Sequence, residues 1–281
     1  MKKININARD RVLKANIAVH SAISEEYNND SHWRPENIAK VKGHIRRISE
    51  GIEFAERRVL DLGCGTGFII NLVKDDFYRV DGVDITEDML KKVDTSNGNI
   101  FLKRAMAEDT GFDSDTFNLV TAYSFLDHLY DVESVLREAY RVLKPGGFFY
   151  ADLNPNRDFW EFISGISEKE SGEYSEIVKR EIDQLANGDT LSNRYGLDKE
   201  VMEDSEPGKS RSKGFDLNEM ALLARDIGFS RVEIIPDWFV GQADLIHNCE
   251  KSELEGVCRY LNKALPVSSV LFKYLRFEFR K

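Results

Sequence analysis

Cysteine, long hydrophobic runs and an excess of basic charge are all missing from this chain of 281 residues. Its 3 cysteines, Cys64, Cys249 and Cys258, are too few to cross-link a chain of this length, which favours a reducing compartment. No apolar run approaches the roughly 18 residues that a membrane-spanning helix needs. The first residues, MKKININARD, lack the apolar stretch of a secretory signal. We therefore expect a cytoplasmic protein without a membrane partner.

The charge balance is acidic, with 49 Asp and Glu against 39 Lys and Arg and a formal net charge of −10. Such a chain lacks the broad basic footprint that neutralises phosphates, so nucleic acid is a disfavoured partner. The charge is unevenly placed, because residues 161–206 hold thirteen acidic and five basic side chains, a net charge of −8. The rest of the chain is nearly balanced.

Apolar patterning indicates an α/β chain. Residues 1–50 carry apolar positions at helical spacing and predict two helices. Helices are also expected from Thr86, from Asp131, and over LNEMALLARDIGF, which ends at Gly228. Alternation of strands with helices argues for a mostly parallel sheet with helices on both faces. The expected strands are VLDLG after Arg58, residues 78–84, 100–104, 117–123 and 148–154, RVEIIP after Ser230, and FKYLRFEF, whose alternation suits a sheet edge.

The strongest motif is Asp61-Leu62-Gly63-Cys64-Gly65-Thr66-Gly67, directly after the first strand. Three alternate glycines let a ligand approach the backbone next to the free N–H groups of a helix start. Asp84 ends the second strand, where a carboxylate can accept hydrogen bonds from both hydroxyls of a ribose. Together they predict a nucleoside-containing ligand. The dinucleotide fingerprint would need a glycine at the position of Phe68, so an oxidoreductase is excluded.

VLDLGCGTG resembles motif I of the class I S-adenosylmethionine-dependent methyltransferases, and REAYRVLKPGGFF is similar to their type 11 subgroup. AMAEDTGFDSDTFNLV looks like the segment that lines the adenine. The match covers about residues 58–154. The resemblance implies a doubly wound, Rossmann-like sheet of seven mostly parallel strands. Its implied parts are an N-terminal helical cap (1–50), a cofactor-binding core (51–154), a lid insertion (155–214), and a completion of the sheet (215–281) with a second insertion at 237–266.

The same resemblance implies which residues bind S-adenosylmethionine. Met106 stands where an acid is common, so adenine recognition would rest on the backbone or on Glu108, and Asn118 stands where Asp is usual. Arg34 could pair with the cofactor carboxylate and Tyr27 could close over it, or Arg34-Pro35 could be an ordinary helix entry. The implied cofactor residues are Asp61, Gly63, Gly65 and Gly67 for the methionine part, Asp84 for the ribose, Met106, Ala107 and Glu108 for the adenine, Ser124 near the cofactor, and also Ile85.

The implied reaction transfers a methyl group to an oxygen or nitrogen atom of a small-molecule acceptor. Alignment of the two groups supplies most of the rate, so a base is useful rather than obligatory. His128 could be that base, or could be a helix-start histidine with a structural hydrogen bond. No metal is expected, because His247, Cys249 and Cys258 lack a fourth ligand. The alternatives are a cofactor-binding regulatory protein without catalysis and a protein or RNA methyltransferase.

The two insertions are expected to enclose the acceptor. The acidic segment 161–206 is either a solvated helical face or a lid that suits a cationic or neutral acceptor. Lys209, Arg211 and Lys213 follow it and could serve an anionic acceptor instead. The aromatic residues expected to form the core of the lid, with some touching substrate, are Phe159, Trp160, Phe162, Tyr174, Trp238 and Phe239.

Overall fold

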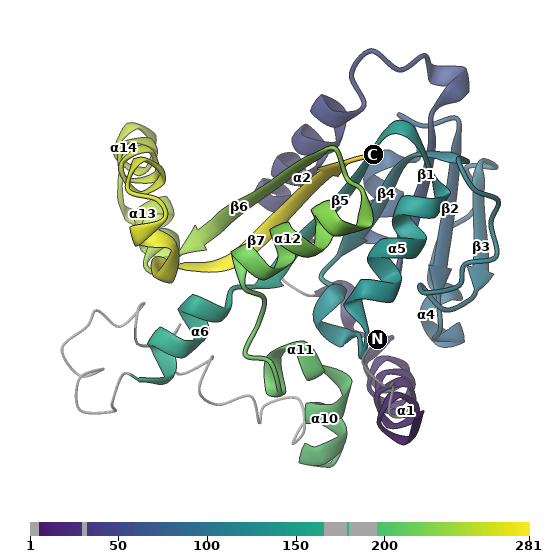
Figure 1. Cartoon of the computed structure of the whole chain (residues 1–281), viewed down its shortest axis with the longest axis horizontal. Coiled ribbons are helices and arrows are strands. Elements are labelled where there is room, and N and C mark those ends of the chain that lie inside the picture. The colour runs from purple at the N-terminus through teal and green to yellow at the C-terminus, as the bar shows by residue number, and fades with distance from the viewer. Residues whose placement is uncertain (1–5, 30–32, 166–178, 180–195) are drawn as a thin grey trace.

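The computed structural model describes residues 6–29, 33–165, 179 and 196–281, and its centre is a twisted sheet of seven strands (Figure 1). The strand order is β3-β2-β1-β4-β5-β7-β6. The neighbouring pairs among the first five strands are all parallel. The strands are β1 (Arg58–Leu62), β2 (Arg79–Asp84), β3 (Ile100–Arg104), β4 (Phe117–Tyr123), β5 (Leu143–Pro155), β6 (Arg231–Phe239) and β7 (Phe272–Arg280).

The closing strand β7 is not at a sheet edge, so that expectation is wrong. It lies between β5 and β6 and pairs antiparallel with both. Phe277 and Phe279 are fully buried on one side of it. The alternate residues Arg276 and Glu278 are also buried, and they form an ion pair with an Nε–Oε1 distance of 3.0 Å. The alternating pattern that suggested a solvent-facing side therefore reflects a buried ion pair.

Helices cover both faces of this sheet, and each face has its own apolar core (Figure 1). One core joins the sheet to α5 and α12, and the other joins it to α2 and α3. The α-helices are α1 (Ile6–Ile23), α2 (Pro35–Ile48), α3 (Phe68–Val73), α4 (Glu87–Leu90), α5 (Val132–Val142), α6 (Arg157–Ser164), α10 (Lys199–Ser205), α11 (Pro207–Ser210), α12 (Leu217–Ile227), α13 (Gln242–Asn248) and α14 (Lys251–Lys263). The 3₁₀ helices are η1 (Tyr27–Asn29), η3 (Phe54–Glu56), η4 (Leu126–His128) and η5 (Val267–Leu271).

Local chemistry explains where several helices begin and end. The Asp131 carboxylate accepts a hydrogen bond from the Ser134 N–H at the start of α5, and Asp216 caps α12 in the same way. Gly228 ends α12 in the left-handed region, at φ 119°. The helix expected from Thr86 is only the single turn α4, and the Thr86 side chain makes no cap hydrogen bond.

The strand expected at 148–154 begins five residues earlier. Leu143 pairs with Phe117 of β4, and after a register shift Phe148 pairs with Leu119. The Lys-Pro-Gly-Gly sequence that stops α5 therefore lies in an irregular start of β5.

The helices α6 and α10 of the first insertion lie apart from one another (Figure 1), and α6 packs against Val240 of the second insertion. α10 packs against α1, while α13 and α14 stand beyond the end of β6 (Figure 1). None of the helices in the described part of the chain is both long and apolar enough to cross a membrane.

Candidate active site

A pocket lies at the carboxyl ends of β1, β2 and β4 and is covered by α1. The strand order reverses between β1 and β4, which is where open α/β sheets bind ligands. The pocket holds about 1090 Å³, including the part open to solvent. It brings together most of the residues expected from the sequence, namely Tyr27, Asp61, Gly63, Gly65, Asp84, Ile85, Met106, Ala107, Glu108, Ser124 and His128.

The three glycines of the loop after β1 have different surroundings. A Cβ on Gly63, at φ 63°, would lie 2.1 Å from the Phe125 ring, so only the absence of a side chain at this position leaves room for the ring. Gly65, at φ 52°, has no atom within 4 Å of such a Cβ, and its backbone is open to the pocket. Gly67 is the N-cap of α3 at φ 89° and faces Val93 rather than the pocket. Only the first two glycines therefore belong to the pocket wall.

Asp84 holds the glycine loop in place with its carboxylate. Its Oδ2 accepts a hydrogen bond from the Gly65 N–H at 2.9 Å, and its Oδ1 accepts one from the Thr86 N–H at 2.7 Å. Each carboxylate oxygen has two acceptor sites, so both oxygens can still accept from a ligand. The residue that the sequence pairs with a ribose is thus fixed at the pocket wall by two backbone donors.

Asp61 is a buried acid at the carboxyl end of β1, with 2% of its surface exposed. Burial raises the pKa of its carboxyl group to about 7, and nearby Asp84 adds to the rise, while a hydrogen bond from the Thr121 hydroxyl opposes it. The Thr121 Oγ1 donates to the Asp61 Oδ1 at 2.7 Å from the neighbouring strand β4. Asp61 therefore changes its charge near neutral pH.

Met106, Ala107 and Glu108 form the wall of the pocket after β3. Arg9 of α1 reaches this wall, with its Nη2 3.3 Å from the Glu108 Oε1 and 4.0 Å from the Met106 sulfur. The sequence offered Glu108 as one of two candidates for recognising the adenine. Its carboxylate is paired with Arg9, a residue that the sequence did not single out.

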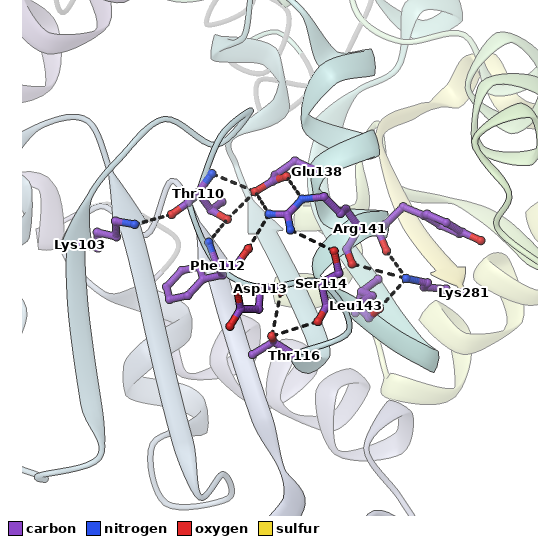
Figure 2. Close-up of polar contacts among 11 residues, drawn as sticks. Lys103, Thr110, Phe112, Asp113, Ser114, Thr116, Glu138, Arg141, Leu143 and Lys281 are labelled. Carbon is purple, nitrogen blue, oxygen red and sulfur yellow. Dashed lines mark hydrogen bonds and ion pairs between the residues drawn. The ribbon is translucent and has the colours of Figure 1, made fainter.

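A polar cluster around the buried side chains of Thr110 and Glu138 holds the segment that follows this wall (Figure 2). The Glu138 Oε1 accepts hydrogen bonds from the Thr110 N–H at 2.9 Å and from the Thr110 hydroxyl at 2.5 Å. Arg141 donates to both Glu138 oxygens and to the Phe112 carbonyl at 2.7 Å. Lys103 donates to the Thr110 carbonyl at 2.7 Å (Figure 2). Two residues of α5 therefore fix the loop that carries Met106–Glu108.

Ser124 follows β4 with a left-handed backbone at φ 48°. Its N–H donates to the Asp152 carbonyl of β5 at 3.0 Å. This backbone conformation is uncommon for a residue other than glycine and often marks a functional turn. It directs the chain from the sheet into η4, which carries His128.

His128 is half-buried at the pocket, and its ring is fixed by the end of α10. Its Nδ1 lies 2.9 Å from the Ser205 carbonyl oxygen, at the end of α10. Its ring also packs edge-on against His20 of α1, with ring centroids 4.9 Å apart. Both of the roles expected for His128 stay open on this geometry, because the ring has a structural hydrogen bond and also faces the pocket.

The described end of the lid is attached to η4 by close packing and charge. A Cβ on Gly208 would lie 2.6 Å from the Asp127 Cα, so only glycine allows α11 to approach this closely. The Lys209 Nζ lies 3.0 Å from the Asp127 Oδ2 and 2.9 Å from the Glu206 Oε1. Asp127 is 1% exposed, so its charge depends on Lys209 for compensation.

The carboxylates of Asp127 and Glu206 and the ring of His128 are close enough together to suggest a metal site among the described residues. The Lys209 ammonium already contacts both carboxylates. Cys249 is exposed and Cys258 is partly buried, both as free thiols, and the side chain of His247 lies outside the described residues.

Arg34 lies away from the pocket, exposed at the N-cap of α2, with Pro35 as the first helical residue. This geometry matches the ordinary helix entry that the sequence left open.

Several pocket residues, on α1 and near Arg34, were not predicted from the sequence. For Asn16, which is 6% exposed, the one signal in the sequence was a polar amide side chain at a position within an apolar helical stripe. The missed residues include Arg9, Asn16, His20, Trp33 and Phe125.

The proposed lid aromatics divide into different surroundings. Phe159 is fully buried, whereas Phe162 is 46% exposed on the same helix, α6. The Trp160 Nε1 is buried without a hydrogen-bond partner among the described atoms, and Trp238 has a left-handed backbone at φ 59°. Phe239 is buried against Phe272. Tyr174 and most of the acidic segment lie outside the described residues.

Comparison with known proteins relates the centre of the chain to methyltransferases. Residues 60–151 match the family model for a methyltransferase domain. The ubiquinone biosynthesis O-methyltransferase of Pseudomonas entomophila is 30% identical over 154 residues, which are 50% of this chain and 64% of that protein. YqeM of Bacillus subtilis is 36% identical over 104 residues, which are 34% of this chain and 42% of that protein. The chain therefore matches 42% to 64% of the length of these curated relatives.

Solved structures share the fold over nearly the whole chain. A phosphoethanolamine N-methyltransferase of Haemonchus contortus, solved with phosphomonomethylethanolamine and S-adenosylhomocysteine, has a TM-score of 0.55 at 16% identity. The alignment covers 100% of this chain and 61% of that one. An S-adenosylmethionine-dependent methyltransferase of Mesorhizobium loti has a TM-score of 0.53 at 17% identity, with 87% and 100% of the two chains covered. At these identities the likeness is one of fold.

Proposed function

We propose that this chain, which carries a class I methyltransferase domain whose cofactor is S-adenosylmethionine, transfers the methyl group to an oxygen or nitrogen atom of a small molecule. The observation that carries the proposal is the pocket at the strand-order reversal, where open glycine backbone and a fixed carboxylate meet. S-adenosylmethionine combines a charged amino acid, a ribose and an adenine. The pocket offers carboxylates, open backbone and apolar walls to match them.

Each part of the cofactor has candidate residues in the pocket. Asp61 would accept from the cofactor ammonium group, and Gly63 together with the open backbone of Gly65 would border the methionine part. Asp84 and Ile85 would hold the ribose, and Ser124 would lie near the cofactor. Met106, Ala107 and Glu108 would border the adenine. Tyr27 would close over the cofactor from η1, where it lines the pocket.

A small acceptor is favoured over a macromolecule because α1 covers the pocket and α10 in turn packs against α1. The relatives point the same way, since one bears the name of an O-methyltransferase of ubiquinone biosynthesis. His128 is the candidate base for an acceptor that must lose a proton. The acidic charge of the chain disfavours RNA.

Titration calorimetry with S-adenosylmethionine tests the cofactor site. Asp84→Ala should raise the Kd about tenfold to a hundredfold, because it removes charged acceptors for the ribose hydroxyls. Asp94→Ala is the matched control, since Asp94 makes a similar turn contact with the Ser96 N–H but is not among the pocket residues. Equal affinities for wild type and Asp84→Ala would contradict the site.

Gly65 and Gly98 give a second matched pair. Both have a positive φ, and neither has an atom within 4 Å of an added Cβ. Alanine should cost each about 1–2 kcal/mol of stability, but only Gly65→Ala should weaken cofactor binding.

Methyl transfer is tested separately, by incubating the protein and labelled S-adenosylmethionine with small phenols, alcohols and amines. Tight binding without any labelled product would favour a regulatory protein.

A further inference from the structure

We propose that His20 of α1 and His128 of η4 act together as the base for the methyl acceptor, each presenting an unprotonated Nε2 to the pocket. The pair selects an acceptor that gives up a hydroxyl proton as it is methylated. This inference rests on the proposed function and extends it to a residue, His20, outside every motif of the sequence. Both rings line the same pocket as the glycine loop and Asp84.

The hydrogen bonds at Nδ1 determine the tautomer of each ring. The His20 Nδ1 lies 2.9 Å from the Asn16 carbonyl oxygen, and the His128 Nδ1 lies 2.9 Å from the Ser205 carbonyl oxygen. A carbonyl oxygen only accepts, so each Nδ1 carries the hydrogen. In a neutral imidazole the other nitrogen, Nε2, then keeps its lone pair. Within the described part of the chain, neither Nε2 has a hydrogen-bond partner.

Asn16 couples the two histidines across a long stretch of sequence. Its carbonyl oxygen accepts from His20, and its side-chain Nδ2 donates to the His128 carbonyl at 3.0 Å. The two imidazole centroids are 4.9 Å apart, with the ring planes at 74°. Asn16 is buried, so its amide has these protein partners in place of water. Asn16 and Ser205 are therefore positioning residues, and the two rings are held as one unit.

The charges around the pair leave His20 neutral near pH 7. Burial lowers the pKa of His20, and His128 lowers it further, while the bond to Asn16 and the carboxylates of Asp84 and Glu206 raise it. Next to His128, the single Lys209 ammonium contacts the carboxylates of both Asp127 and Glu206, so these three groups together keep a net negative charge. A neutral His20 beside this net negative charge suits a neutral acceptor better than an anionic one, which would need a cation beside it.

The balance of the step defines the acceptor class. The acceptor oxygen forms a bond to the methyl carbon, the bond from that carbon to the sulfonium sulfur breaks, and its electron pair stays on sulfur. The hydroxyl proton goes to one Nε2, and the second Nε2 accepts a hydrogen bond that orients the acceptor. A tertiary amine or a thiolate needs no proton acceptor, so the pair would give them no advantage.

Histidine NMR with ¹⁵N-labelled protein tests the premise without any substrate. We expect both His20 and His128 to be Nδ1–H tautomers with unprotonated Nε2 at pH 7.5. An Nε2–H tautomer at either ring would overturn the proposal. Asn16→Ala should broaden or shift both ring signals, because it removes the amide that holds the His128 backbone beside His20. The signals of His44, which lies outside the pocket beside Tyr150, should stay in place.

Kinetics with hydroxyl acceptors test the chemistry. Asparagine keeps a donor near the Nδ1 position and removes Nε2, so His20→Asn and His128→Asn should each lower kcat about a hundredfold. Both should also flatten the rise of kcat with pH. His44→Asn is the control and should leave kcat and its pH profile unchanged.

Calorimetry with S-adenosylmethionine separates the two possible failures. If the wild-type protein does not bind S-adenosylmethionine, the proposed function itself is wrong. Wild-type binding and transfer, with kcat within about twofold in both asparagine variants, would defeat the histidine pair alone. If no hydroxyl compound turns over while amines do, the proposed acceptor class is wrong.

Discussion

Asp61 shows how one side chain can combine a structural position with a chemical role. Its carboxyl group is buried at the end of β1 and receives a hydrogen bond from Thr121. Because burial raises its pKa to about 7, the folded protein binds this proton more tightly than the unfolded chain does. The stability of the free protein therefore falls as pH rises from about 4 to 7. A cationic ligand would reverse that preference, because it favours the ionised form.

Cofactor affinity should consequently depend on pH through Asp61. We expect the Kd for S-adenosylmethionine to fall about tenfold between pH 6 and pH 8, because ionised Asp61 attracts the cofactor ammonium group. Asp61→Asn should bind more weakly and with little pH dependence. Calorimetry in buffers of different ionisation enthalpy would measure the proton released on binding. A wild-type Kd that is flat across this range would contradict the role of Asp61.

At the scale of elements, α10 and α11 are tied to the pocket side of the sheet by buried charge. Two of the described acids there have basic partners, since Asp204 pairs with Arg11 and Arg211, and Glu206 pairs with Lys209. These acids hold α10 and α11 against α1 and η4. Lys209 and Arg211 are their partners in the same ion pairs. Of the basic side chains considered for an anionic acceptor, Lys209 and Arg211 thus have structural partners, whereas Lys213 has none among the described residues.

Lys209→Met should loosen this attachment. It leaves the buried charge of Asp127 without its cation, which we expect to cost about 2–3 kcal/mol of the free energy of unfolding. Hydrogen exchange should increase in η4 and α11, and adding Asp127→Asn should recover part of the loss. Lys251→Met, at a side chain 88% exposed, is the control. Equal melting temperatures for Lys209→Met and the control would show that the ion pair does not hold the lid.

The same attachment should weaken in acid. Burial alone would raise the pKa of Asp127, but the charge of Lys209 and the hydrogen bond that it donates lower it below its ordinary value. A lowered carboxyl pKa means that the pair stabilises the fold above about pH 4 and that this contribution is lost as pH falls through the folded-state pKa.

At the scale of the whole molecule, the position of β7 decides which residues form the core. Parallel strands β1 to β5 follow from the alternation of strands and helices, but β7 enters between β5 and β6 in the opposite direction. This places Phe277 with α5 and α12 in one core. The other side of β7 carries Arg276 and Glu278, and Arg47 of α2 reaches Glu278 at 2.6 Å.

A comparison of two phenylalanines tests this topology. Phe277→Ala should destabilise the fold by about 3–5 kcal/mol, because it opens a cavity in a fully buried site. Phe101→Ala, on the edge strand β3 where the ring is 47% exposed, should cost less than about 1 kcal/mol. Urea unfolding of both variants gives the measurement. Similar small losses would mean that β7 lies at an edge.

The sequence by itself determined the elements and the cofactor side of the pocket. Glycine spacing and an acid after the next strand are local signals, because short loops must place them at adjacent strand ends. Gly63, Gly65, Asp61 and Asp84 therefore lie together in the pocket. The same reasoning predicted a helix longer than α4 and a strand shorter than β5. The start of β5 is set by its pairing with β4, which the local sequence does not reveal.

Only the tertiary structure decided which distant segments meet. The position of β7, the outward placement of Arg34 and the pairing of His20 with His128 all depend on packing between segments far apart in the chain. Asn16 and His128 are 112 residues apart, and Ser205 lies 77 residues beyond His128. No periodicity or spacing encodes such contacts, because burial and hydrogen bonding select them only when α1, η4 and α10 are packed together.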